Sequence, residues 1–210
     1  MSKFALQTLP RRVRQKRFIL CVVGLGRVGL PLAAVFAHKG VNVIGVDNDM
    51  QRLNKIKQFK CPFHDPELQQ ILDLPLVQSH LSFVGNLEVA SSKSDIILIT
   101  VGTPINQYLL PDCSFLNAAF ESISKAGLTG KAVLLRSTVP PRFTADLIQF
   151  LKKKQHLEVG VDFALAMCPE RILEGRAIDE IRSLPEIVGA VDVLSSEIAA
   201  QLTAIELLCR

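Results

Sequence analysis

Aromatic residues are scarce in this sequence. Tryptophan is absent, tyrosine occurs once, and aromatic residues together make up 6% of the chain. A surface that stacks nucleic-acid bases needs aromatic side chains interleaved with basic ones, and the basic segment of this chain does not have that arrangement. We therefore expect no nucleic-acid partner.

Paired cysteines and metal-binding spacings are also missing. The five cysteines are odd in number and widely spaced, at Cys21, Cys61, Cys113, Cys168 and Cys209. Without a C-x-x-C pair, neither a zinc ribbon nor a thioredoxin-type site is indicated, and the four histidines show no metal-site spacing. This usage is not that of a disulfide framework and is typical of a reducing cytosol. We expect a cytoplasmic protein without a metal site.

The formal net charge of +4 is concentrated at the amino terminus. Six basic residues and no acidic residue precede residue 18, and the rest of the chain is mildly acidic. These basic residues are Lys3, Arg11, Arg12, Arg14, Lys16 and Arg17. We interpret residues 1–16 as a solvated basic leader, with binding to nucleic acid or anionic lipid as the alternative.

The basic segment followed by the apolar run 18–37 imitates a signal or membrane sequence. Arg27 and three glycines interrupt this run, however, and another strand-like apolar run follows at once. We therefore predict no membrane span.

Short runs rich in Val and Ile alternate with segments of helical period. The predicted strands are 18–23, 41–46, 81–84, 95–100, 132–136, 162–167 and 186–188. The predicted helices are 28–39, 50–59, 66–72, 115–126, 144–154 and 194–207. Continuous rather than alternating apolarity is typical of parallel strands covered by helices on both faces. At 210 residues, the pattern predicts a single α/β domain over 17–210, a doubly wound, mostly parallel, Rossmann-like sheet.

The strongest motif is G-x-G-x-x-G at residues 24–29. It follows a predicted strand, opens a predicted helix, and precedes a second strand that ends at Asp47, close to the spacing of about 20 residues in the dinucleotide fingerprint. Gly24 permits the turn, Gly26 lets the backbone approach a pyrophosphate, and Gly29 lets the helix pack on the sheet. Free N–H groups at the helix start then bind the anion.

Asp47 is the expected ribose ligand. Its carboxylate can accept hydrogen bonds from both ribose hydroxyls and would repel a 2′-phosphate, so the pattern favours NAD over NADP.

Two further turns follow predicted strands, Val101-Gly102-Thr103 and Ser137-Thr138. Because ligands of open α/β sheets bind outside the carboxyl ends of the strands, these turns are expected at the same cleft. Ordinary loop chemistry explains them equally well.

Several stretches together resemble the UDP-glucose/GDP-mannose dehydrogenase family of nucleotide-sugar 6-dehydrogenases. These stretches are GLGRVGLPLA, VIGVDND, DPELQQIL, ILITVGTPIN, LRSTVPP, CPERILEGRAIDEI and IVGA. They lie in the family's order over about residues 17–208. Ser-Thr-Val-Pro and Cys-Pro-Glu-Arg are much more specific than the glycine motif, and Pro-Glu-Arg is similar to the branch that acts on UDP-N-acetylhexosamines.

The resemblance implies oxidation of a UDP-sugar C6 alcohol to a carboxylate, with two NAD and a cysteine thioester. It implies that Thr138 helps to order the catalytic water and that Glu170 assists this water, work suited to a carboxylate. The implied substrate-binding residues are Glu170, Arg171, Ile172, Leu173 and Glu174. The cofactor-binding candidates are Gly24, Gly26, Arg27, Val28, Gly29, Asp47, Val101, Gly102, Thr103, Ser137 and Thr138. The parent enzyme is expected to be a homo-oligomer.

Three catalytic residues of the family pattern are missing from this sequence. The family's nucleophilic cysteine in a Gly-Gly-x-Cys context, and its catalytic lysine and asparagine on a central helix, do not occur within the 210 residues. Cys168 is a poor substitute, because Glu170 would disfavour its thiolate. Arg142-Phe143 also replaces a small residue or glycine, so that helix is expected to begin differently.

We therefore interpret the chain as an NAD-binding domain that does not turn over by itself. The alternatives are a stand-alone NAD(H)-binding regulatory module and a small Rossmann dehydrogenase of the β-hydroxyacid type, which also needs a lysine from a second domain.

Overall fold

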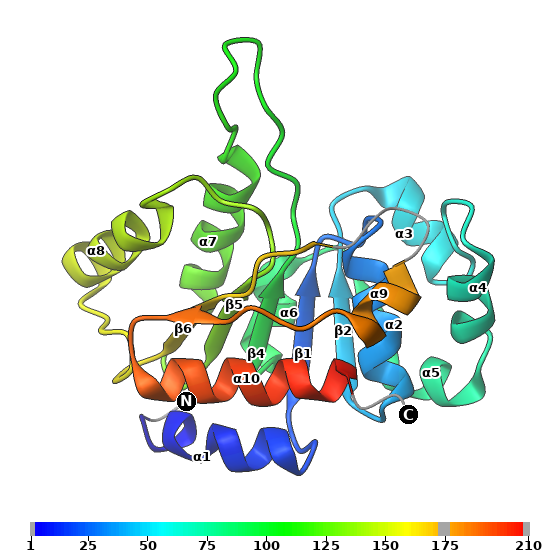
Figure 1. The fold of residues 1–210 in the computed structure, drawn as a ribbon, viewed down its shortest axis with the longest axis horizontal. Coiled ribbons are helices and arrows are strands. Elements are labelled where there is room, and N and C mark those ends of the chain that lie inside the picture. Colours follow the sequence, from blue (N-terminus) through cyan, green and yellow to red (C-terminus); the bar gives the residue numbers. More distant parts are fainter. Residues whose placement is uncertain (1–2, 172–176, 208–210) are drawn as a thin grey trace.

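The computed structural model describes residues 3–171 and 177–207. They form an α/β domain around a seven-stranded sheet of order β3-β2-β1-β4-β5-β6-β7 (Figure 1). The first six strands are parallel and β7 is antiparallel to β6. The strands are β1 (Ile19–Val23), β2 (Asn42–Val46), β3 (Leu81–Val84), β4 (Ile96–Ile99), β5 (Ala132–Leu135), β6 (Ala164–Met167) and β7 (Gly189–Ala190). The predicted doubly wound, mostly parallel fold is confirmed.

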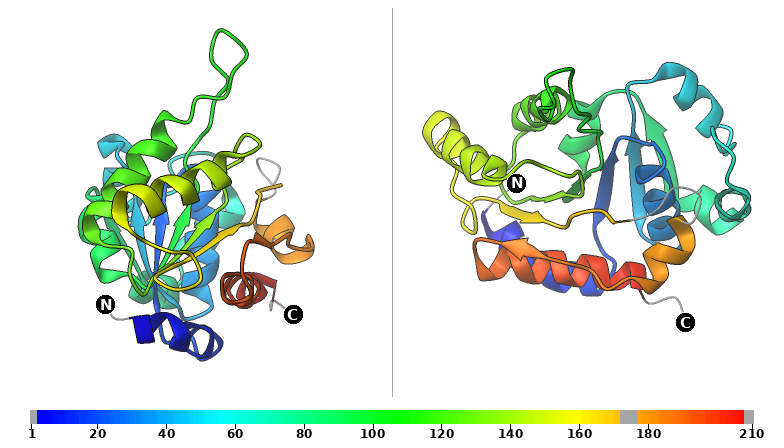
Figure 2. Two further views of the ribbon diagram at one scale, coloured as in Figure 1. Left: turned by 90° about the vertical axis from the view of Figure 1, so that its left-hand side faces the viewer. Right: turned by 45° about the horizontal axis from the view of Figure 1, so that its top comes forward.

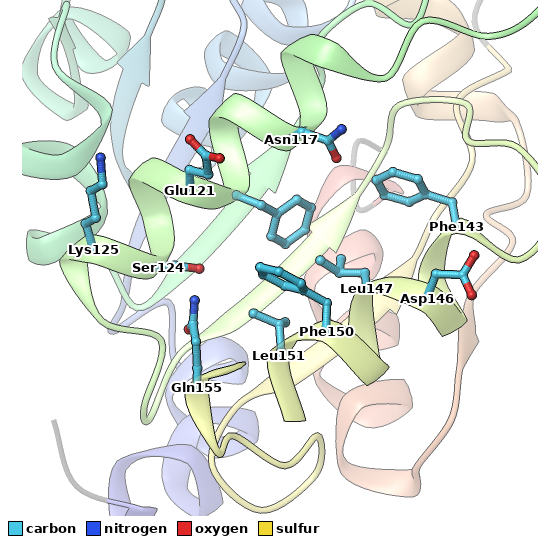
Figure 3. Close-up of a pocket in the computed structure, with 11 residues that line it drawn as sticks. Asn117, Glu121, Ser124, Lys125, Phe143, Asp146, Leu147, Phe150, Leu151 and Gln155 are labelled. Carbon is cyan, nitrogen blue, oxygen red and sulfur yellow. The ribbon is translucent and has the colours of Figure 1, made fainter. Parts of the chain in front are cut away.

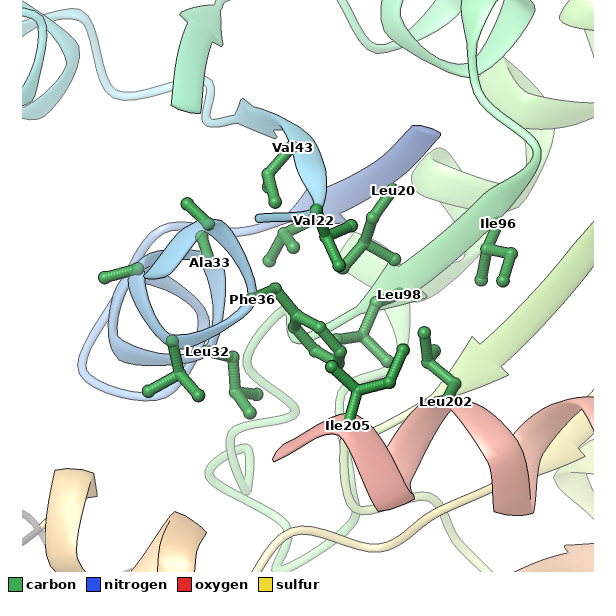
Figure 4. Close-up of a cluster of buried hydrophobic side chains, with 14 of the residues drawn as sticks. Leu20, Val22, Leu32, Ala33, Phe36, Val43, Ile96, Leu98, Leu202 and Ile205 are labelled. Atoms are coloured by element: carbon green, nitrogen blue, oxygen red, sulfur yellow. The ribbon is translucent and has the colours of Figure 1, made fainter. Parts of the chain in front are cut away.

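Helices cover both faces of the sheet (Figure 2). They are α1 (Lys3–Arg14), α2 (Gly29–His38), α3 (Met50–Ile56), α4 (Pro66–Leu72), α5 (Pro75–His80), α6 (Leu87–Lys93), α7 (Ser114–Ala126), α8 (Phe143–Gln155), α9 (Ala177–Ser183) and α10 (Val193–Leu207). Alternate residues of β1 enter two separate cores. Leu20 and Val22 pack with the α2 and α10 side (Figure 4), whereas Cys21 and Val23 pack with the α6, α7 and α8 side. Burial on both faces explains the continuous apolar runs.

Strand register places the functional turns at one edge. Val23 pairs with both Val46 and Ile99, and Ile99 in turn pairs with Leu135, which pairs with Met167. The residues that directly follow these strands therefore share the carboxyl edge of the sheet, where ligands of this architecture bind. These residues are Gly24, Asp47, Thr100, Arg136 and Cys168.

The predicted elements agree with the structure except in a few places. The six predicted helices are present, with ends within about three residues, but the last strand lies at Gly189–Ala190 and not at 186–188. The pattern missed α1, α5, α6 and α9, of which the last three have only six or seven residues. The start of α8 follows Arg142 in the left-handed conformation, with φ +73°, where glycine would be favoured.

The expectation of a solvated leader is wrong. Residues Lys3–Arg14 form α1, which buries Leu6, Leu9 and Val13 and packs beside α10. The Arg12 guanidinium also lies 2.8 Å from the Asp95 carboxylate. The clustered charges obscured the apolar spacing of 6, 9 and 13, which puts these three side chains on one helix face.

Across residues 3–171 and 177–207, no helix combines the length and apolarity needed to cross a membrane.

Candidate cofactor and substrate cleft

The glycine loop connects β1 to α2 by very close packing. Gly24 adopts φ +91°, a conformation that favours glycine, and donates its N–H to the Val46 carbonyl at 2.8 Å. A Cβ on Gly29 would lie 1.8 Å from the Gly24 carbonyl oxygen and 2.4 Å from the Thr100 hydroxyl. At Gly26, by contrast, a Cβ would meet no protein atom within 4 Å. The loop is therefore tight against the sheet at its two ends and open at its middle glycine.

The buried carboxylate of Asp47 ties the end of β2 to this loop. Its Oδ2 accepts the Leu25 backbone N–H at 2.7 Å, and its Oδ1 accepts the Asp49 N–H at 2.9 Å. A carboxylate offers about four acceptor positions. Arg52 Nη1 also donates to Oδ2 at 2.7 Å, so described residues occupy three of these positions and Oδ1 keeps one.

Arg52 is a site residue that the sequence interpretation did not include. One guanidinium nitrogen lies 2.7 Å from the Asp47 Oδ2, and the side chain lines the same cleft. It is held there because Asp49 caps the start of α3 by accepting the Arg52 N–H at 3.0 Å. The sequence feature that could have identified Arg52 is a basic residue in the first turn of the helix that follows the predicted ribose ligand, Asp47.

These groups line a cleft of about 730 Å³ at the carboxyl edge of the sheet. Among the predicted cofactor residues, Gly24, Gly26, Asp47, Val101 and Gly102 lie in its wall. The structure adds residues that the sequence interpretation missed, from the turn after β3 and from α7: Gly85, Asn86, Phe115, Ala118, Ala119 and Ser122. The open Gly26, the adjacent helix start and the Asp47 carboxylate fit a dinucleotide, with the loop N–H groups near the pyrophosphate and Asp47 at the ribose.

Arg27, Val28 and Gly29 are not among the residues that line this cleft. The Arg27 guanidinium lies 5.0 Å from the centre of the Phe63 ring, in cation–π geometry. Val28 packs against the core, and Gly29 is buried at the loop contact described above.

The two other predicted turns are hydrogen-bonded to one another. The Thr103 hydroxyl donates to the Thr138 carbonyl at 2.7 Å, and the Ser137 hydroxyl donates to the Val101 carbonyl at 2.6 Å. Thr138 is exposed, whereas Ser137 is buried. These bonds bring the turn after β4 and the turn after β5 together beside the cleft.

Glu170 follows β6 and is bound to this same region through Arg136. The Arg136 Nη2 and Nε donate to Glu170 Oε2 at 2.8 Å and 3.2 Å. The other carboxylate oxygen accepts the Arg171 backbone N–H at 2.7 Å. The Arg171 side chain donates to the Pro185 carbonyl. The remaining predicted substrate residues, Ile172, Leu173 and Glu174, lie outside the described residues.

The cysteine thiols near the sheet are poor nucleophiles. Burial raises the pKa of Cys168 to about 12, although the nearby Arg136 cation opposes that shift. Burial also raises the pKa of Cys21 to about 12. Attack requires a thiolate, so neither buried thiol is suited to form a thioester. No cluster of three or more metal-ligating side chains occurs in the described parts of the chain.

A second groove, of about 680 Å³, lies between α7 and α8 (Figure 3). Its apolar wall includes Phe143, Leu147 and Phe150, with Glu121 and Asp146 also among its lining residues. It contains none of the predicted site residues.

Comparison with known proteins gives one consistent result. The model of the UDP-glucose/GDP-mannose dehydrogenase family, NAD binding domain, matches residues 18–205. The chain is 34% identical over 188 residues to UDP-N-acetyl-D-mannosamine dehydrogenase of Methanocaldococcus jannaschii, covering 87% of this chain and 41% of that protein.

Solved structures show the same relationship. The UDP-D-ManNAc dehydrogenase of Pyrococcus horikoshii is 30% identical with a TM-score of 0.84, and the match covers 91% of this chain and 46% of that one. The NDP-N-acetyl-D-galactosaminuronic acid dehydrogenase of Methanosarcina mazei is 28% identical with a TM-score of 0.86, over 99% and 45% of the two chains. This chain thus spans less than half the length of these relatives. It belongs to the UDP-glucose/GDP-mannose dehydrogenase family, whose NAD-binding domain it contains.

Proposed function

We propose that this chain is the NAD-binding part of a nucleotide-sugar 6-dehydrogenase that acts on a UDP-N-acetylhexosamine. The overall reaction oxidises the sugar C6 alcohol to a carboxylate, with two NAD and a cysteine thioester. The observation that supports this proposal best is the carboxyl edge of the sheet, which the glycine loop, Asp47, the Thr103–Thr138 contact and Glu170 share.

The cofactor is held by the first half of the sheet. The backbone N–H groups of the glycine loop bind its pyrophosphate, and the Asp47 carboxylate accepts hydrogen bonds from the adenosine ribose. NAD, when bound, supplies the hydride acceptor. Asp47 disfavours a 2′-phosphate, and Arg52, 2.7 Å from it, partly offsets this repulsion.

The segments that follow β5 and β6 serve the substrate. Thr138 is exposed beside the cleft and orders the catalytic water. Glu170, fixed through one carboxylate oxygen by Arg136, accepts a proton from that water as the general base. The segment from Arg171 to Glu174 contacts the sugar nucleotide.

Turnover needs groups that these 210 residues do not supply. No Gly-Gly-x-Cys sequence occurs in them, and burial keeps Cys168 as a thiol by raising its pKa to about 12. We therefore expect these residues by themselves to bind NAD without oxidising the sugar, and the complete enzyme to be a homo-oligomer.

The test combines calorimetric titration with an absorbance assay for NADH. The chain is expected to bind NAD more tightly than NADP, and to form no NADH when NAD and UDP-N-acetylmannosamine are supplied together. Tighter binding of NADP would refute the role of Asp47. Steady NADH formation that requires the sugar would refute the assignment of chemistry to residues outside this chain.

A further inference from the structure

Arg136 occupies an unusual position next to the substrate side of the cleft. It directly follows β5, and its side chain is only 1% exposed. Three carboxylates surround the guanidinium: Glu170 at 2.8 Å, Glu186 at 2.6 Å and Glu206 at 3.6 Å. A buried arginine is tolerated only when its charge and its N–H donors are matched in this way.

The three partners come from three different parts of the fold. Glu170 follows β6, Glu186 precedes β7, and Glu206 lies near the end of α10. Arg136 therefore joins both ends of the connection between β6 and β7, which contains the predicted substrate segment. Arg171 adds a second link across this connection by donating to the Pro185 carbonyl.

Each side of the guanidinium has a separate partner. Nε and Nη2 both donate to Glu170 Oε2, while Nη1 donates to Glu186 Oε2. The backbone completes the Glu170 attachment, because its N–H donates to the Arg136 carbonyl at 3.1 Å. Glu170 is thus held at both its main chain and its side chain by one residue.

Glu206, at 3.6 Å, is the most distant of the three carboxylate partners of Arg136. Burial raises the pKa of Glu206 to about 8, against the opposing effect of Arg136. Around neutral pH, Glu206 is therefore largely protonated, and the guanidinium charge is shared between Glu170 and Glu186. A lysine would supply the charge but not the planar set of donors that reaches both carboxylates.

We propose that Arg136 is a positioning residue that fixes the Glu170 carboxylate and, through Glu186, both ends of the substrate-contacting connection. The inference rests on the proposed function, in which Glu170 acts on the catalytic water. It predicts that the orientation of Glu170 depends on the paired donors Nε and Nη2 of Arg136 and not merely on a buried positive charge.

The test uses NMR of the 210-residue chain with labelled arginine side chains and labelled glutamate carboxyl carbons. Among the described residues, Nε of Arg136 donates to Glu170 alone, so its N–H signal should be protected from solvent exchange. Glu170→Gln should make this exchange at least about tenfold faster. Glu186→Gln is the matched control, because it neutralises the partner of Nη1 and not that of Nε, and should leave the Nε exchange rate within about twofold.

The effect on Glu170 itself is followed by its carboxyl resonance, which is assigned by its loss in Glu170→Gln. Arg136→Gln and Arg136→Lys should both shift this resonance, and lysine should fail to restore its position. A Glu170 resonance unchanged in both variants, or an Nε–H signal unaffected by Glu170→Gln, would overturn the proposal. So would full restoration by lysine, which would reduce the role of Arg136 to charge.

Measuring NAD affinity distinguishes a failure of this inference from a failure of the proposed function. Both Arg136 variants should bind NAD within about twofold of the unsubstituted chain, because the Asp47 contacts do not involve Arg136. Failure of the unsubstituted chain to bind NAD would refute the proposed function alone. A shifted Glu170 signal combined with lost NAD binding in the variants would show general misfolding and would count against a specific positioning role.

Discussion

Gly29 packs so closely against Gly24 that a methyl group at position 29 would lie 1.8 Å from the Gly24 carbonyl oxygen. The same methyl would lie 2.4 Å from the Thr100 hydroxyl, which itself donates to the Gly24 carbonyl at 2.7 Å. The first and last glycines of the loop are thus required by the fold itself. The middle glycine, Gly26, faces open space, so the fold does not require it, whereas the proposed approach of a pyrophosphate would.

Two alanine substitutions separate these requirements. Gly29→Ala should destabilise the chain by about 1–3 kcal/mol, because the loop or α2 must move. Gly26→Ala should change the free energy of unfolding by less than about 0.5 kcal/mol but should lower NAD affinity by about tenfold or more, since its methyl enters the cleft. Urea unfolding and calorimetric titration measure the two effects. Normal NAD binding by Gly26→Ala would contradict the assignment of the pyrophosphate site.

The docking of α1 can be tested at Leu9, which is fully buried. Leu9→Ala should lower the free energy of unfolding by about 2–5 kcal/mol, through lost transfer energy and a residual cavity. Gln7→Ala, on the exposed face of the same helix, is the control and should change it by no more than about 0.5 kcal/mol. Equal stability of the two variants in urea would mean that α1 does not pack on α10 in solution.

The sequence predicted the parallel sheet well because each central strand is buried on both faces and carries its own apolar run. It did not predict α1, since the buried Leu6, Leu9 and Val13 belong to a segment in which basic residues and the absence of acidic ones dominate the composition. Docking of α1 on α10 joins the two ends of the described chain, a contact that no local pattern contains.

The site, too, was predictable only where its residues lie close together in the sequence. The glycine loop and Asp47 belong to one short βαβ segment, so spacing alone indicated them. The sequence did not indicate Arg136 as a site residue, because its partners Glu186 and Glu206 lie 50 or more residues away along the chain. In the sequence, Glu206 also resembles an ordinary exposed polar residue of a helix, although the fold buries it completely.

Burial of Glu206 makes the stability of the chain depend on pH. Its pKa is raised from 4.5 to about 8, mainly by burial, with Arg136 opposing and Glu186 and Glu170 adding to the shift. The folded state therefore binds this proton more tightly than the unfolded state does. The stabilisation is complete below pH 4.5, declines as the pH rises, and is lost above about pH 8.

Glu206→Gln should remove this dependence, because its neutral amide imitates the protonated acid. The variant should be more stable than the unsubstituted chain above about pH 8, by about 1–4 kcal/mol. Below pH 4.5 the two chains should converge. Denaturant unfolding across this range provides the measurement, and a constant difference between the two chains at every pH would show that Glu206 is not the responsible group.

The central claim is that the Asp47 carboxylate, bonded to the Leu25 N–H at 2.7 Å, completes an NAD site. Calorimetric titration of the unsubstituted chain, Asp47→Ala and the exposed control Asp73→Ala with NAD tests it most directly. We predict that Asp47→Ala lowers NAD affinity by about tenfold or more, the loss expected when hydrogen bonds to a charged group are removed, and that Asp73→Ala binds as the unsubstituted chain does. Equal NAD affinity in all three proteins would contradict the account.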